Sequence, residues 1–341
     1  MKQYDLIAIG DSTTDAFIKL KDASVHCNID HEKCEICLRF KDKIPYEEVY
    51  VVPAVGNAAN ASVAAARLGL QSALISNVGD DYFGKEAIGA LKNESVGIEF
   101  MTINDNKKTN YHYVLWYEDD RTILIKHEEY SYALPDINDP KWIYLSSSAE
   151  NSLPFHEAFE RYMNAHPNIK LAFQPGTFQM KMGKEKLAGL YKRADVFISN
   201  KEEAQRILEI EEEDVKGLIS ALHALGPKIV VVTDGVKGAY ASENGSPSVT
   251  SGQNSQSEFW FMPPYPDPKP PFERTGAGDA FSSTFVVALA LGLDIPSALR
   301  WAPINSMSVV QYVGAREGLL TREKLEEYLA KAPKDYEPKK I

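Results

Sequence analysis

The chain has 341 residues and a mass of 38.0 kDa; 44% of the residues are hydrophobic and 25% are charged, which fits a globular protein with a sizeable core in one large or two modest domains. The formal net charge of −11 argues against a nucleic-acid partner, because proteins that bind the phosphate backbone usually carry a basic surface. No apolar run approaches the roughly 20 residues that span a bilayer, and the sequence opens on a buried-strand pattern rather than a signal peptide. We therefore expect a cytoplasmic protein with no membrane partner.

Short apolar, β-branched runs alternate with amphipathic stretches along most of the chain. The runs predict strands at 5–9, 72–76, 142–146, 169–173, 196–199 and 228–233. The amphipathic stretches predict helices at 58–68, 82–94, 153–166, 184–193, 201–208, 215–225, 278–291, 295–313 and 321–331. A repeated strand–helix order is typical of a mostly parallel sheet with helices on both faces, so we expect a three-layer α/β/α fold.

Two segments interrupt this order with a β-type pattern and no helix between. The first is 16–53, and the second is 109–127, which reads as a hairpin that turns at Asp119 and Asp120. Both are expected beyond the ends of the core strands, where they would pair into a small β-sheet lid over a cleft. We expect one domain over 1–332, with these lid segments, and a C-terminal tail at 333–341.

The stretch between the last predicted strand and the last three helices is polar and then rich in proline. Residues 242–257 are mostly Ser, Gly and Asn, and "FWFMPPYPDPKPPFE" follows. Proline fixes an extended or turn backbone and excludes helix, so we expect a loop that leads to a glycine turn.

That turn, "TGAGDAF", has almost no side chains before an aspartate at the start of a helix. Backbone N–H groups of Gly276, Ala277 and Gly278 can point outward together, and the helix N-terminus adds partial positive charge, so an anion hole is predicted. Asp279 beside it is placed to take a proton from a hydroxyl during phosphoryl transfer. The plain alternative is an acidic helix start after a glycine turn.

A second stretch, "AVGNAANASVAAARLG", places Gly56, Asn57 and Asn60 just before or within a helix of small residues. Carboxamides both donate hydrogen bonds to sugar hydroxyls and accept them. The alternative is a helix cap followed by a close-packed alanine helix.

Together with the downstream "VGDDYFG", these two stretches resemble the ribokinase family of sugar and nucleoside kinases, also called the PfkB family. The resemblance extends over nearly the whole chain. "DLIAIGDSTTD" resembles the family's first strand with its sugar-binding aspartate, "SNKEEA" its Asn-x-x-Glu, and "VVTDGVKGAYA" its nucleotide loop.

The resemblance implies a role for each matching position, within a ribokinase-like fold. Asp279 would be the catalytic base, next to an anion hole at Gly276, Ala277 and Gly278. The positions implied to hold the phosphoryl acceptor are Asp15, Gly56, Asn57 and Asn60.

The nucleotide side is implied in the same way. Asn200 and Glu203 would organise Mg²⁺ and the ATP phosphates through water, and Thr233, Gly235 and Gly238 would lie along the nucleotide. Independently, Asn200 follows a predicted strand at its carboxyl end, where open α/β sheets bind ligands. The alternative for Asn200 and Glu203 is a helix cap and its capping-box partner.

The late motif departs from the family pattern just before the glycine turn. Glu273 stands where the family usually has an aspartate that helps to form a monovalent-cation site, so such a cation is left open. Arg274 either supplies positive charge near the phosphates or pairs with Glu273 at the surface, and we expect the pair.

The first lid segment carries Cys27, His31, Cys34 and Cys37, the ligand types of a structural zinc site, in an irregular spacing. The alternative is three reduced thiols in a lid hairpin, since an odd, clustered cysteine count fits a reducing compartment better than a disulfide framework. A redox pair is less favoured still, because no thioredoxin-like pattern surrounds the cysteines.

The second lid segment carries Tyr111, Tyr113, Trp116 and Tyr117, which either stack on a nucleobase or sugar or pack against the other lid segment or a second subunit. Arg121 reaches a substrate or phosphate, or is a solvated hairpin charge.

We expect transfer of the ATP γ-phosphoryl group to a hydroxyl of a small sugar. A nucleoside acceptor is the alternative, and a non-catalytic sugar or nucleotide sensor is a further one. An exposed lid edge would allow a homodimer.

Overall fold

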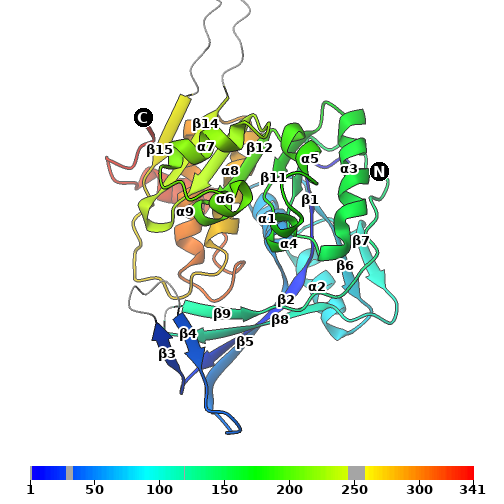
Figure 1. Ribbon diagram of the computed structural model, residues 1–341, viewed down its shortest axis with the longest axis vertical. Helices are drawn as coiled ribbons and strands as arrows, with labels where there is room; N and C mark the ends of the chain where they lie inside the picture. The colour runs from blue at the N-terminus through cyan, green and yellow to red at the C-terminus, as the bar shows by residue number, and fades with distance from the viewer. Residues whose placement is uncertain (1, 28–33, 119, 245–257) are drawn as a thin grey trace, which may run out of the picture.

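Layers of helices enclose a large sheet, and a smaller sheet lies beyond one end of it (Figure 1). The computed structural model describes residues 2–27, 34–118, 120–244 and 258–341. Within these residues, no helix is both long and apolar enough to cross a membrane.

The large sheet of the described residues has ten strands in the order β16-β15-β14-β13-β12-β11-β10-β1-β6-β7. The parallel strands are β1 (Leu6–Ile9), β6 (Ser72–Gly79), β7 (Met101–Asn104), β10 (Trp142–Leu145), β11 (Lys170–Phe173), β12 (Val196–Asn200) and β13 (Ile229–Thr233). The antiparallel edge consists of β14 (Ala239–Glu243), β15 (Glu258–Met262) and β16 (Lys339–Lys340).

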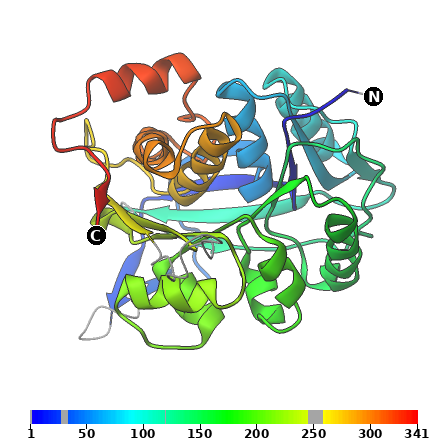
Figure 2. The same ribbon diagram turned by 90° about the horizontal axis from the view of Figure 1, so that it is seen from above.

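Helices cover both faces of this sheet (Figure 2). One layer contains α1 (Asn57–Arg67), α2 (Tyr82–Asn93), α8 (Ala277–Ala290), α9 (Ile295–Val309) and α10 (Arg322–Ala330). The other contains α3 (Leu153–Ala165), α4 (Thr177–Met182), α5 (Ala188–Arg193), α6 (Lys201–Leu208) and α7 (Val215–His223). Side chains alternate across the strands: in β1, Leu6 and Ala8 join one core cluster, and Ile7 and Ile9 join the other. The predicted three-layer α/β/α fold is confirmed.

The lid is a four-stranded sheet in the order β5-β2-β8-β9, formed by β2 (Thr13–Leu20), β5 (Tyr46–Val55), β8 (Asn110–Tyr117) and β9 (Asp120–Leu124). β8 and β9 form the predicted hairpin, and β8 runs parallel to β2. A separate hairpin, β3 (Ser24–Cys27) with β4 (Cys34–Cys37), extends from the first lid segment.

Several segments differ from the expected structure, among them β7 and β14, which form strands where none was predicted. Residues 258–262 form β15 rather than a loop, because the prolines begin only at 263 and the preceding run can pair with β14. Residues 177–182 form α4, a short helix before the predicted one. The final residues, expected as a tail, return to the body through β16 and the buried Tyr336.

The cysteines of the β3–β4 hairpin do not form the predicted zinc site. The antiparallel register places Cys27 directly opposite Cys34, and the two form a disulfide, while Cys37 is a free thiol. His31 lies outside the described residues. A disulfide uses two of the four predicted ligands, and the described part of the chain contains no cluster of three His, Cys, Asp or Glu placed to hold a metal. The expectation of reduced thiols is likewise wrong for this pair.

Candidate active site

The glycine turn before α8 is shaped by a backbone conformation that only glycine adopts easily. Gly276 caps the helix with a φ of 82°, and a Cβ there would lie 2.2 Å from the Cβ of Ala315. Ser306 Oγ donates a hydrogen bond to the Ala277 carbonyl (2.9 Å), which ties the turn to α9. The N–H groups at the start of α8 are therefore held in place beside the next charged residue, Asp279.

Asp279 lies in the first turn of α8 and is half-buried. Burial raises its pKa to about 6, and the charge of Asp15 adds to this, while hydrogen bonds from Asn60 and Gln174 oppose the increase. Asn60 Nδ2 lies 2.8 Å from Oδ2, and Gln174 Nε2 lies 3.5 Å from Oδ1. A carboxylate with this pKa is suited to act as a general base near neutral pH.

Two cavities, each of about 270 Å³, meet at this turn. We name them by one lining residue: the Asp15 cavity lies towards the lid, and the Thr233 cavity lies against β13, α8 and α9. Thr275 and Asp279 line the Asp15 cavity, whereas Ala277 and Gly278 line the Thr233 cavity. The carboxylate and the backbone of the turn thus stand between the two spaces.

The Asp15 cavity brings together all the residues predicted to hold the phosphoryl acceptor: Asp15, Gly56, Asn57 and Asn60. Gly56 caps α1 with a φ of 105°, and a Cβ there would lie 2.8 Å from the carbonyl oxygen of Asp11. Its missing side chain therefore allows β1 and α1 to approach closely.

Sequence reasoning missed other lining residues of the Asp15 cavity: Asp11, His112, His127, Phe178 and Thr275. Asp11 could have been predicted from the sequence, because it follows β1 at the strand's carboxyl end. The histidines could not, because only the pairing of β8 with β2 brings His112 opposite Asp15.

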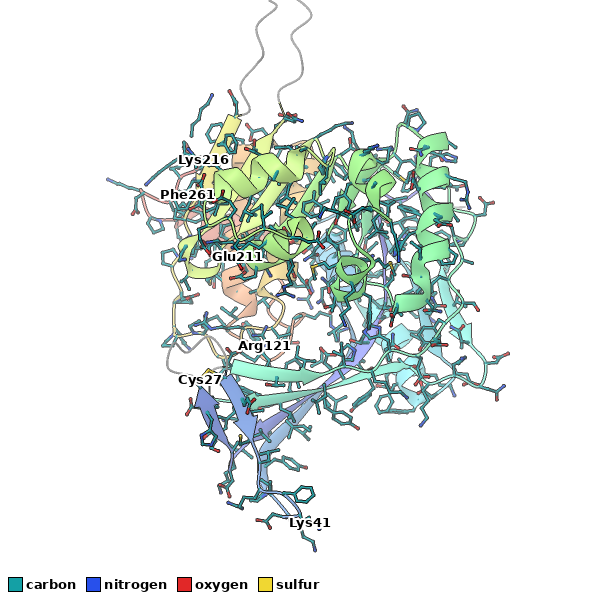
Figure 3. All side chains as sticks on the ribbon, in the orientation of Figure 1. Cys27, Lys41, Arg121, Glu211, Lys216 and Phe261 are labelled. Atoms are coloured by element: carbon teal, nitrogen blue, oxygen red, sulfur yellow. A yellow bond between two sulfur atoms is a disulfide. The ribbon has the colours of Figure 1, made fainter. Side chains whose placement is uncertain are left out.

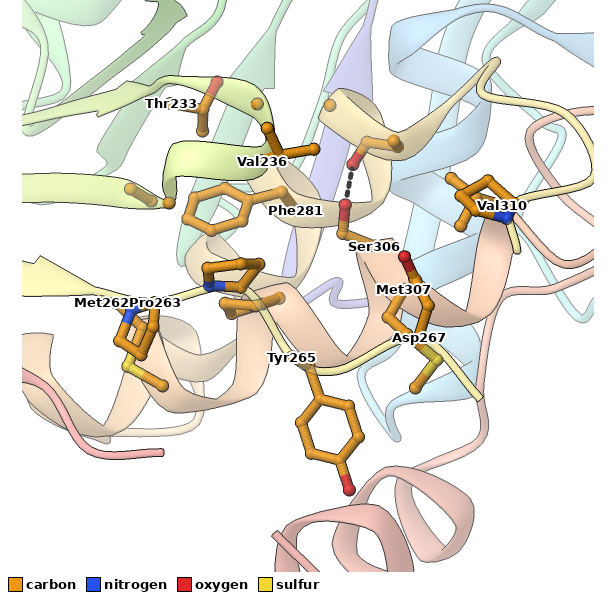
Figure 4. A pocket seen from close by; sticks show the side chains of 18 of the residues that line it. Thr233, Val236, Met262, Pro263, Tyr265, Asp267, Phe281, Ser306, Met307 and Val310 are labelled. Carbon is orange, nitrogen blue, oxygen red and sulfur yellow. Dashed lines mark hydrogen bonds between the residues drawn. The ribbon is translucent and has the colours of Figure 1, made fainter. Parts of the chain in front are cut away.

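The Thr233 cavity contains the predicted nucleotide loop (Figure 4). Thr233, Gly235 and Gly238 line it, and a Cβ on Gly238, whose φ is 109°, would lie 2.5 Å from the carbonyl oxygen of Met262. Its other walls are mostly apolar, with Val236, Met262, Pro263, Tyr265, Phe281 and Met307. An apolar cavity beside an anion-binding turn suits a planar base attached to phosphates.

Asn200 and Glu203 form the capping box that was the plain alternative for them. Asn200 Oδ1 accepts from the Glu203 N–H (2.7 Å), and Glu203 Oε2 accepts from the Asn200 N–H (3.0 Å). The pKa of Glu203 is raised, first by burial and further by the charge of Asp279. A buried carboxylate with a raised pKa is stabilised by a nearby cation. The side-chain oxygens of Asn200 and Glu203 therefore also fit as ligands of a Mg²⁺ ion that keeps several waters.

The residues just before the turn contact the tip of the lid. Glu273 is only 1% exposed, and its Oε1 accepts from the N–H and Oγ1 of Thr275 at 2.7 and 2.6 Å. Arg121 Nε of the lid (Figure 3) lies 3.6 Å from the same oxygen. Trp116 packs edge-on against Phe272, with ring centroids 5.0 Å apart.

This arrangement corrects the expected surface pair of Glu273 with Arg274. Glu273 is buried and faces Arg121, whereas Arg274 is exposed and lines the Thr233 cavity beside Ala277 and Gly278. Arg274 therefore lies beside the cavity expected to hold the nucleotide, which favours the other interpretation, that it supplies positive charge near the phosphates.

Two of the four lid aromatics, Tyr111 and Trp116, pack against the body of the protein, and Tyr113 is exposed. Tyr111 packs against Phe83 of α2 (4.6 Å between ring centroids) and against Tyr113, and Trp116 is buried. None of them lines the Asp15 or the Thr233 cavity.

A carboxylate between an apolar cavity and a polar, lid-covered cavity is the arrangement expected of a small-molecule kinase of the α/β class. Residues 22–322 match the family model described as "pfkB family carbohydrate kinase". The chain belongs to this family, and it is a phosphotransferase that acts on a sugar hydroxyl.

Known relatives agree with this assignment. A ribokinase from Bacillus subtilis is 29% identical over 81% of this chain and 87% of its own length. A 5-dehydro-2-deoxygluconokinase from Bacillus anthracis is 24% identical over 81% of this chain and 86% of its own. The fold is similar to that of Arabidopsis thaliana ribokinase complexed with ribose and ATP, with a TM-score of 0.74, 20% identity and coverage of 96% of this chain and 99% of that one.

Proposed function

We propose that the chain transfers the γ-phosphoryl group of ATP to a hydroxyl of a small sugar, with Asp279 as general base and the Gly276–Gly278 turn as anion hole. The observation that carries this proposal is the position of Asp279. Its carboxylate lies where the two cavities meet, at the N-terminus of α8, with its pKa raised to about 6.

In the proposed reaction, the acceptor binds in the Asp15 cavity and ATP binds in the Thr233 cavity. Asp279 takes the proton of the acceptor hydroxyl as its oxygen attacks the γ-phosphorus, and the bond to the β-phosphate oxygen breaks to release ADP. The N–H groups of Ala277 and Gly278 would stabilise the negative charge on the transferring group. Asn200 and Glu203 would hold Mg²⁺ through water, and the ion supplies positive charge for the phosphates.

A sugar is favoured over a nucleoside as the acceptor. Two of the lid aromatics that would stack on a base, Tyr111 and Trp116, pack instead on Phe83 and Phe272. A non-catalytic sensor is disfavoured because it has no need for a base whose pKa is tuned towards neutrality.

The test is ATP consumption against a panel of sugars and nucleosides, with Asp279→Asn as the matched variant. We expect turnover with at least one sugar and its loss by orders of magnitude in the variant, with the fold retained by circular dichroism. Near-normal turnover by Asp279→Asn would contradict the role of Asp279 as general base. A nucleoside as the best acceptor would support the alternative, a nucleoside kinase.

We also propose a cytoplasmic location, which fits a reaction that consumes ATP.

We further propose a homodimer formed through the lid. The edge strand β5 exposes Tyr46, Val49 and Val51, and unpaired edges with apolar side chains favour pairing. Light scattering should then give twice the mass of 38.0 kDa. A monomer at micromolar concentration would rule out the dimer.

A further inference from the structure

The Asp15 cavity has an unusual balance of charge for a site that binds a metabolite. Its described lining residues include three carboxylates, Asp11, Asp15 and Asp279, and two imidazoles, His112 and His127, but no lysine or arginine. Even with both imidazoles protonated, the cavity stays net negative once Asp279 is ionised, as a base must be. A carboxylate or phosphate on the acceptor would therefore meet a net charge of its own sign.

Each imidazole is held by one of the aspartates. His127 Nδ1 lies 3.0 Å from an Oδ of Asp11, which is 2% exposed and also accepts from the hydroxyl of Tyr132 (2.8 Å). His112 Nδ1 lies 3.3 Å from an Oδ of Asp15, which is 8% exposed. The two pairs fix both rings, whose centroids lie 5.3 Å apart.

The aspartates also determine which ring nitrogen is available. A neutral imidazole that donates Nδ1–H to a carboxylate presents Nε2 as an acceptor. His112 Nε2 is buried and has no hydrogen-bond partner within the described residues. A buried polar atom of this kind needs a partner, and a hydroxyl group supplies the missing donor.

The cavity also has apolar lining residues. Ile123 of β9 and Ile125 line it from the lid, and both side chains are exposed to solvent, while Phe178 packs against the ring of His127. Apolar side chains together with hydrogen-bonding groups suit a molecule that has both C–H surface and hydroxyls.

We propose that the phosphoryl acceptor is an uncharged polyhydroxy compound, and that His112 and His127, fixed by Asp15 and Asp11, are specificity-determining residues that bind its hydroxyls. This inference rests on the proposed function and narrows it, because it excludes sugar acids and sugar phosphates as the preferred acceptors.

The first experiment compares matched acceptors with the wild-type chain. D-Ribose and D-fructose are assayed beside D-ribonate, D-gluconate and the 5- and 6-phosphates of the two sugars, with ADP release as the readout. We expect kcat/KM for the best neutral sugar to exceed that for every anionic compound at least 30-fold. A smaller preference, or an anionic compound as the best acceptor, overturns the inference even where Asp279-dependent kinase activity is present.

The second experiment tests the histidines. His112→Leu removes the Nε2 acceptor, and we expect the KM for the neutral sugar to rise at least tenfold, with the KM for ATP within twofold of wild type. Tyr113→Phe is the matched control, since Tyr113 is the next residue on β8 and its side chain is exposed. Calorimetric binding of the sugar without ATP gives a readout independent of turnover. Unchanged sugar affinity in a folded His112→Leu chain contradicts the proposed role.

Discussion

Asp279 is a charged group kept in an environment that disfavours its charge. Burial raises its pKa to about 6, well above the ordinary value for an aspartate, and only the donors of Asn60 and Gln174 oppose that effect. The folded chain therefore binds a proton here more tightly than the unfolded chain does. The stability that protonated Asp279 contributes is full below about pH 4 and is lost as the pH rises through about 6, where the folded chain also ionises this group.

Replacement of Asp279 by asparagine should separate activity from stability. We expect kcat to fall by roughly 10²–10⁴-fold because the base is lost. The melting temperature at pH 7.5 should stay equal or rise, because a poorly solvated charge is removed. Asp105→Asn, at an exposed turn, is the control for both measurements. A large loss of stability would show that the carboxylate supports the fold.

The pH profile of the reaction should report the same group. We expect kcat/KM to fall as pH drops through about 6, since protonated Asp279 cannot accept the hydroxyl proton. Asn60→Leu removes a donor that lowers this pKa, so the acid limb should move to higher pH. Profiles of both proteins with saturating ATP check this, and an unmoved limb would argue against the Asn60 contact.

At the scale of elements, an ion pair and an aromatic contact join the lid hairpin to the residues just before the glycine turn. Arg121 approaches the buried carboxylate of Glu273, and Trp116 packs on Phe272 one residue earlier. Glu273 in turn holds Thr275 at the start of the turn. The position of β8 and β9 is thereby linked to the backbone of the glycine turn, the proposed anion hole.

Arg121→Gln should weaken this link. The guanidinium is partly exposed and its Nε lies 3.6 Å from Glu273, so we expect a loss of about 1 kcal/mol in the free energy of unfolding by urea. The double variant Arg121→Gln/Glu273→Gln should cost less than the sum of the single variants, because each removes the same pair. Lys126→Gln, on the same lid segment, is the control, and strict additivity would mean that the two charges do not interact.

The disulfide of the β3–β4 hairpin predicts how many thiols react before and after reduction. With Cys27 and Cys34 joined, a thiol reagent should titrate one cysteine per denatured chain before reduction and three after it. Cys37→Ser should then leave none before reduction. Three reactive thiols in the untreated protein would show that the disulfide is not formed.

Strong periodicity made most elements predictable from sequence. The helix at 201–208 was placed to the residue, because its cap, capping-box partner and apolar face agree. β15 was missed because its aromatic run was read together with the prolines that follow it. α4 was missed because a six-residue helix shows too little periodicity to recognise.

At the scale of the whole molecule, the site is assembled from distant parts of the chain. Asn60 and Asp279 are 219 residues apart in sequence, yet they share a hydrogen bond because α1 packs against α8. Ordered motifs were enough to assign both residues to one site. The pairing of Asp11 with His127, and the contact of the lid with Glu273, depend on how the lid sheet docks, which no local pattern encodes.

The division of the Asp15 cavity between lid and body also bears on how this protein can change. Asp279 and Asn60 belong to the body, whereas His112 and Ile123 are carried by lid strands. Substitutions that alter the lid wall leave Asp279 and its hydrogen bond from Asn60 in place. Directed evolution of new acceptors could therefore be confined to a few strand positions, with the proposed general base unchanged.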